Sequence, residues 1–185
     1  MVCLIRVTPP KYTTASASFT YDLGARANVP RYVLVGFKNN TIGGNNQVDQ
    51  IGINRSLFTH AYVTDIFITL GSERYPYSPL QCDFPNNKYG MAYQMFRQFC
   101  KKMGVSTSLD GIDFRDRFPI YCFDLSARAS VLDSNTTSIN VQLNVVRAPP
   151  NNVDTIDVFP VLFCERLYKL DYVAGAYTTS QRVWW

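Results

Sequence analysis

One amphipathic helix in an otherwise strand-rich sequence is the feature that most limits how this chain can fold. Between about residues 87 and 103, apolar side chains recur at the spacing of a single helical face. Asn86 or Asn87 can cap the start, and Gly104 stands where a left-handed C-cap residue would. Such a helix must lay its stripe on a sheet or at the mouth of a barrel. The stripe consists of Tyr89, Ala92, Tyr93, Phe96, Phe99, Cys100 and Met103.

Strand-like runs lie on both sides of this helix. Apolar and polar side chains alternate most cleanly over residues 138–146, and Pro160 indicates a sheet edge or a bulge in the last run. The stretches 41–50 and 105–117 are expected to be polar loops. We therefore expect an all-β antiparallel sandwich of seven or eight strands, Ig-like or jelly-roll, with one inserted helix. Six strand-like stretches can be delimited, at residues 16–22, 31–38, 59–70, 118–124, 138–146 and 156–171.

Length and composition set further limits. The 185 residues suffice for one buried core, which we place at residues 16–176, between arms at 1–15 and 177–185. The net charge of +4 comes from scattered Lys and Arg, which predicts weak or no direct nucleic-acid binding. Five cysteines without a CxxC pair predict neither disulfide framework nor zinc site, and they fit a reducing intracellular compartment. We see no signal peptide or membrane span, and expect a protein that is not secreted.

The ionisable residues offer little for catalysis or metal binding. The only histidine, His60, is interpreted as structural, and nothing pairs it with a nucleophile. The carboxylates Asp110, Asp113 and Asp116 lack the spacing of a calcium loop and are interpreted as solvated. Nothing in the sequence orients Asp83 and Asp124 as a catalytic pair. We therefore predict no enzyme activity, no catalytic or metal-binding residues and no cofactor.

The two expected arms carry residues that suit contacts with a neighbouring subunit. Trp184 and Trp185 end a polar tail without a local core, and burial of a large aromatic side chain is worth roughly 1.5–3 kcal/mol. Pro9 and Pro10 stiffen the other arm. We predict these four residues as inter-subunit contacts, with a terminus that makes no contacts as the alternative.

The order of several short motifs resembles a known family. A Tyr75-Pro76 turn precedes a Leu80-x-x-Asp83-Phe84 link and a Tyr93-x-Met95-Phe96 helix segment. A Pro119-to-Ser126 strand follows, with Asp124 two residues before Ser126. Together these motifs resemble the second, C-terminal jelly roll of double jelly-roll major capsid proteins of Polinton (Maverick) elements, adintoviruses and virophages. Ala127-Arg128 departs from the family's Lys-Gln, and the chain has room for one roll where the family has two.

The resemblance implies a jelly-roll fold and a structural role in a viral or virus-derived capsid. It implies that Tyr75, Pro76, Asp83, Phe84, Tyr93, Met95, Pro119, Asp124 and Ser126 are structural motif residues. It also implies location in a virion and association with itself as a trimer or ring, and with other capsid proteins. The alternative hypothesis is a jelly-roll binding module that recognises a glycan, peptide or nucleic acid through the 39–50 and 105–117 loops.

Overall fold

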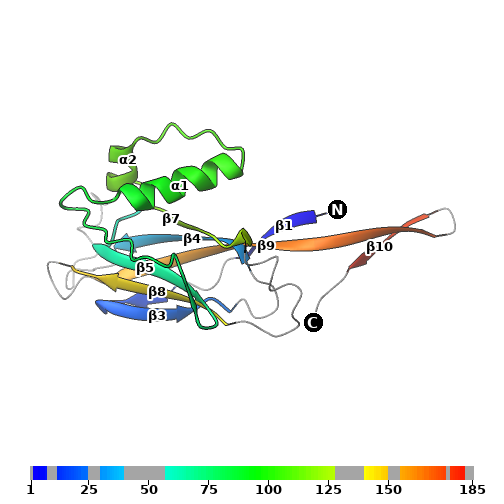
Figure 1. Ribbon diagram of the computed structural model, residues 1–185, viewed down its shortest axis with the longest axis horizontal. Helices are drawn as coiled ribbons and strands as arrows, with labels where there is room; N and C mark the ends of the chain where they lie inside the picture. Colours follow the sequence, from blue (N-terminus) through cyan, green and yellow to red (C-terminus); the bar gives the residue numbers. More distant parts are fainter. Residues whose placement is uncertain are drawn as a thin grey trace, which may run out of the picture.

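The protein is a two-sheet sandwich with two helices outside one sheet (Figure 1). The computed structural model describes residues 2–7, 12–24, 30–39, 57–127, 140–149, 155–173 and 176–181. In Figure 1 the helices, the sheet that they cover and the opposite sheet form three successive layers. No helix in the described ranges is long and apolar enough to cross a membrane.

The two sheets are antiparallel throughout. Sheet A has the order β1-β9-β4-β7, and β2 and β10 also pair with β9. Its strands are β1 (Val2–Val7), β2 (Tyr12–Thr14), β4 (Pro30–Asn39), β7 (Tyr121–Asp124), β9 (Ile156–Val173) and β10 (Ala176–Gln181). Sheet B has the order β3-β8-β5-β6. Its strands are β3 (Ser18–Asp22), β5 (Val63–Leu70), β6 (Glu73–Tyr75) and β8 (Val141–Arg147).

The strand pairs are nested along the chain. The innermost pair is β5 with β6, and around it lie β4 with β7, β3 with β8, and β2 with β9. Such nesting arises when one long hairpin folds over on itself, so that β4 also meets β9 and β5 also meets β8. This topology confirms the expected antiparallel jelly-roll sandwich.

The alternation in the sequence becomes the inward and outward faces of the strands. Val141, Leu143 and Val145 of β8 are fully buried, whereas Gln142 and Asn144 between them face outward. Alternate residues of β5 are buried in the same way. The core thus lies between the two sheets, where period-two patterning places it.

Helix α1 (Gly90–Lys102) confirms the inserted helix, but it begins three residues later than expected. The predicted N-cap, Asn86 or Asn87, is wrong: Tyr89 is the N-cap, and no side chain caps the first turn. Asn86 instead belongs to a tight turn, in which it donates to the Asp83 carboxylate. The C-terminal end is as expected, because Gly104 has φ +67°. Its N–H donates to Lys101 O (3.2 Å) and that of Val105 to Cys100 O (2.9 Å), as in a Schellman motif.

A second helix corrects the prediction that residues 105–117 form a loop. Helix α2 (Gly111–Asp116) is capped by Asp110, whose carboxylate accepts the N–H of Asp113 at 2.8 Å. The fully buried Phe114 packs against Tyr93 and Phe96 of α1, with ring centroids 5.3 and 5.5 Å apart. Six residues give less than two turns, which is too short for the periodicity to be visible in the sequence.

Both ends of the chain contribute strands to sheet A. Residues 2–7 and 12–14, expected as an arm, pair with β9 as β1 and β2. Residues 176–181 pair with the far end of β9 as β10. Pro160 lies between the part of β9 that pairs with β2 and the part that pairs with β1, so it borders a described strand only on the β4 side. A proline tolerates such a local edge because it has no N–H to donate.

Candidate assembly surfaces

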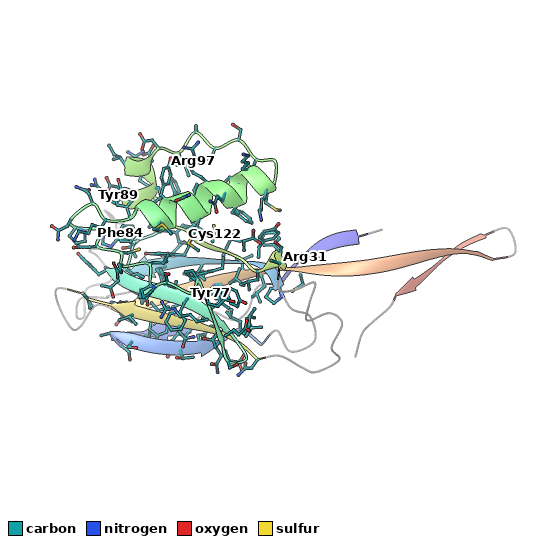
Figure 2. The ribbon with its side chains drawn as sticks, in the orientation of Figure 1. Arg31, Tyr77, Phe84, Tyr89, Arg97 and Cys122 are labelled. Carbon is teal, nitrogen blue, oxygen red and sulfur yellow. The ribbon has the colours of Figure 1, made fainter. Side chains whose placement is uncertain are left out.

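The outer face of sheet A is apolar, and α1 covers part of it. The Phe99 ring packs against Tyr32 of β4 at 5.5 Å and Phe163 of β9 at 6.0 Å. Phe96 and Cys100 of α1 are buried. Cys122 on the edge strand β7, which lies next to α1 in Figure 2, is buried as well. Burial raises the pKa of the Cys122 thiol, which is consistent with a site closed to water. The helix therefore covers the outer face of sheet A on the side of β7.

Next to the helix, a strip of partly buried apolar side chains follows β9. Phe159, Val161 and Phe163 alternate with inward-facing residues and remain partly exposed. Lys38 places its ammonium 5.4 Å from the Phe159 ring centroid and 5.4 Å from that of Phe58. Phe58 lies so close to Gly36 that a Cβ there would be 2.5 Å from the ring. This part of sheet A is thus an apolar surface with the Lys38 ammonium over it.

The outer face of sheet B has the opposite character. Thr20 of β3 donates to the Asn144 side-chain oxygen at 2.7 Å, and the Asn144 amide donates to Thr69 of β5 at 2.7 Å. The Arg74 guanidinium of β6 lies 3.9 Å from the ring centroid of Phe67 on β5 and pairs with Asp65 of the same strand at 2.6 Å. Most groups on this face are therefore polar, and they form hydrogen bonds or ion pairs with one another.

Beyond the sandwich, β9 continues with β10 as a two-stranded ribbon (Figure 1). The 18-residue strand β9 pairs with β4 only as far as Cys164, whereas β10 pairs with Tyr168–Val173. The ribbon carries backbone edges that no described strand occupies. The strand pattern of residues 156–171 predicts the length of β9, but nothing in the sequence indicates that its end leaves the sandwich.

The Asp83-Phe84 link anchors the start of the helix layer. Asp83 and Lys88 exchange two backbone hydrogen bonds of 2.8 Å, which closes a tight turn. Phe84 is 1% exposed and stacks between the rings of His60 (4.8 Å) and Tyr89 (5.7 Å). Figure 2 shows Phe84 and Tyr89 at the start of α1. The link therefore fixes where α1 begins.

Asp124 and Ser126 anchor the other end of α1. The Asp124 carboxylate accepts the Ser126 N–H at 3.0 Å and the Ser126 hydroxyl at 2.6 Å, and it forms an ion pair with Lys102. Burial alone would raise the pKa of Asp124, but these partners hold it below its usual value. Asp124 thus joins the last turn of α1 to the end of β7, whereas Asp83 belongs to the tight turn before the start of α1.

The remaining motif residues have separate structural positions. The Tyr93 hydroxyl donates to Leu109 O at 2.9 Å, which ties α1 to the segment before α2. Met95 packs on the core and Pro119 is buried. Tyr75 packs on the core below the turn, and Pro76 accepts from Arg74 at 3.2 Å through its carbonyl oxygen. Tyr77, one residue further, is 66% exposed and is the most exposed large apolar side chain in the described part of the chain.

The acidic residues of α2 do not converge on a cation. Asp116 pairs with Arg115 at 2.5 Å, and Asp113 pairs with Arg117 at 3.4 Å. Within the described ranges, no three His, Cys, Asp or Glu side chains are grouped as metal ligands would be. The predicted contacts Pro9, Pro10, Trp184 and Trp185 lie outside the described residues.

Comparison with known proteins gives one family. A family model described as double jelly roll-like domain matches residues 4–166. No curated protein shows a significant match to the chain. The matched range spans the whole sandwich, from β1 to the middle of β9, together with both helices.

Proposed function

The chain belongs to the double jelly roll-like domain family, and on this basis we propose that it is a structural subunit that associates with further jelly rolls to build a capsid-type shell. The observation that carries the proposal is the β9-β10 ribbon, which leaves the sandwich. An isolated two-stranded hairpin is marginally stable in water, and its unpaired edges readily accept another strand. A ribbon of this kind gains stability when it packs on or pairs with a neighbouring subunit.

The partner in this proposal is another copy of the same chain, in a trimer or ring, with other capsid proteins as further contacts. A closed ring requires heterologous contacts, in which one surface of each copy meets a different surface of the next. The ribbon supplies one surface, and the apolar strip of Phe159, Val161 and Phe163 is of a suitable character for the other. Pro9, Pro10, Trp184 and Trp185, near the chain ends, are proposed as additional contacts.

The motif residues support a structural role in this proposal. Phe84 at the start of α1 and Asp124 at its end hold the helix layer against sheet A. Proteins of this family are typically structural, and we propose no catalysis. From the motif order we further propose kinship with the Polinton, adintovirus and virophage capsid proteins. In this proposal the protein is located in the virion, and before assembly it resides in a reducing intracellular compartment.

The test is the assembly state of the full chain at micromolar concentration. Light scattering after size exclusion should give a discrete oligomer, and electron microscopy of the same peak should show rings or shell fragments. A variant with Thr178→Pro and Ser180→Pro removes two backbone N–H groups from β10. We expect it to raise the dissociation constant at least about tenfold, which corresponds to about 1.4 kcal/mol, with an unchanged far-UV spectrum.

Two outcomes would contradict the proposal. A full chain that stays monomeric at all concentrations, but melts at a higher temperature with a glycan, peptide or oligonucleotide, would favour a binding module. An oligomer that the proline variant leaves unchanged would exclude the ribbon as the contact. Truncation after Leu167 serves as a second variant, since it removes the ribbon and retains the whole register between β1 and β9.

A further inference from the structure

The turn that leads into β5 depends on the ring of His60. Its Nδ1 accepts the backbone N–H of Tyr62 at 3.0 Å. Ala61 and Tyr62 both have left-handed backbone conformations, with φ +53° and +52°, which residues other than glycine seldom adopt. The Thr59 hydroxyl accepts the N–H of Ala61 at 3.2 Å. Two local hydrogen bonds from side chains to the backbone therefore stabilise an unfavourable backbone conformation.

His60 also connects this turn to the helix layer. Its ring stacks on Phe84 with an interplanar angle of 9°, and Phe84 in turn stacks on Tyr89, the N-cap of α1. Its carbonyl oxygen accepts the Tyr121 hydroxyl of β7 at 3.1 Å. His60 thus contacts the entrance of β5 and the edge strand β7 directly, and it reaches the start of α1 through Phe84.

The contact with Tyr62 requires a neutral imidazole. A protonated histidine carries hydrogen on both ring nitrogens, so Nδ1 can no longer accept an N–H. Burial is the largest influence on the pKa of His60 and lowers it; Asp116 raises it and Arg115 lowers it, both from α2. Among the residues that the structure describes, the Tyr121 hydroxyl and the buried Arg147 of β8, which donates to Ala61 O at 3.1 Å, also contact the turn.

We propose that His60 is an acid-sensitive latch between the sandwich and the helix layer. Protonation breaks the bond to Tyr62, sets two N–H donors against each other and loosens the ring stack that holds Phe84 and the start of α1. The latch is a property of the single chain and does not depend on assembly. Its consequence is a helix layer that is firmly attached near neutral pH and loosens on acidification.

The direction of the pH effect follows from the preference of the fold for neutral His60. The unfolded chain binds this proton with a pKa of about 6.5. Stability is therefore complete above about pH 6.5 and decreases as the pH falls below it, until the folded chain also binds the proton. Carboxylates contribute to acid denaturation only at lower pH, which leaves a window between about pH 6.5 and 5 in which His60 acts alone.

The test uses the fact that the chain contains one histidine. Its ring signals can be followed by NMR from about pH 8 to 5 without assignment of other residues, and we expect a midpoint below about 6.5. The melting temperature should fall by at least about 2 °C between about pH 7.5 and 5.0. The matched variant is His60→Asn, because an asparagine side chain accepts the N–H two residues on but does not titrate. We expect that the melting temperature of this variant does not fall between these two pH values.

An equal decrease in the His60→Asn variant and the natural chain would overturn the proposal, as would a histidine midpoint at or above about 6.5. If the variant does not fold, the natural chain decides. The ring signals of Phe84 and Tyr89 must then shift with the same midpoint as His60. Signals that stay constant while His60 titrates would show that no latch opens.

Discussion

The outer faces of the two sheets are stabilised in different ways. On sheet A, α1 buries Phe96 and Cys100, and the Phe99 ring extends this contact to β4 and β9. On sheet B, Thr20, Asn144 and Thr69 form a chain of hydrogen bonds across three strands. Apolar burial requires a covering layer, whereas a satisfied polar face can remain in water. The comparison indicates that sheet A is the side where additional contacts bring the larger gain.

The largest expected effect comes from removing the central ring of the helix layer. Phe114→Ala should lower the free energy of unfolding by about 3–5 kcal/mol, because the buried ring packs against Tyr93 and Phe96. Denaturant unfolding measures the loss. Ile112→Ala, at a position that is 61% exposed on the same helix, is the control and should change stability by about 0.5 kcal/mol or less. Equal losses in the two variants would mean that α2 is not part of the core.

A smaller effect is expected on sheet B. Asn144→Ala removes two hydrogen bonds, and each contributes about 0.5–1.5 kcal/mol net, so the loss should be about 1–3 kcal/mol. Gln142→Ala, at an outward-facing position of the same strand, is the control. Should Asn144→Ala cost as much as Phe114→Ala, the contrast between the two faces would not hold.

The smallest effect should come from the ion pair at the end of α1. Asp124→Asn removes the charge that pairs with Lys102 while an amide oxygen can still accept from Ser126, so we expect a loss of about 0.2–1 kcal/mol near pH 7. Since its partners lower the pKa of Asp124, the stabilisation is complete above about pH 4 and disappears as the pH falls further. Chemical unfolding at about pH 7 and about pH 3 measures it. Variant and natural chain should converge at the lower pH, and a constant difference would contradict this origin.

The sequence predicted the elements whose patterns are long enough to be read. The alternation in β8 and the stripe of α1 both placed the correct residues inside. Helix α2 was missed because six residues hold too little periodicity, although Asp110 three residues before Asp113 is an N-cap signal that could have indicated it. The N-cap prediction for α1 was wrong because Asn86 is engaged by Asp83, a contact that depends on the turn rather than on helix propensity.

The candidate surfaces were less predictable than the fold. The motifs in the sequence identified Phe84 and Asp124. They could not indicate that Phe84 anchors the start of α1 and Asp124 anchors its end. Which sheet the helix covers depends on the pairing of β7 with β4, a contact between distant parts of the chain. The projection of the ribbon depends on where β4 ends relative to β9, and periodicity carries no information on that register.

The nested pairing of the strands also sets the order in which the protein can fold. The hairpin of β5 and β6 joins neighbouring residues, whereas β2 must find β9 across more than a hundred residues, as in the 2.7 Å bond from Thr13 to Asp157. Closing long loops is slow, so the inner pairs are expected to form first and the outer pairs last. During synthesis, β1 and β2 must wait for β9, with which they pair, whereas β4 can pair with β7 before β9 is made. Sheet A therefore remains open until nearly the whole domain has left the ribosome, while the β5-β6 hairpin can already form.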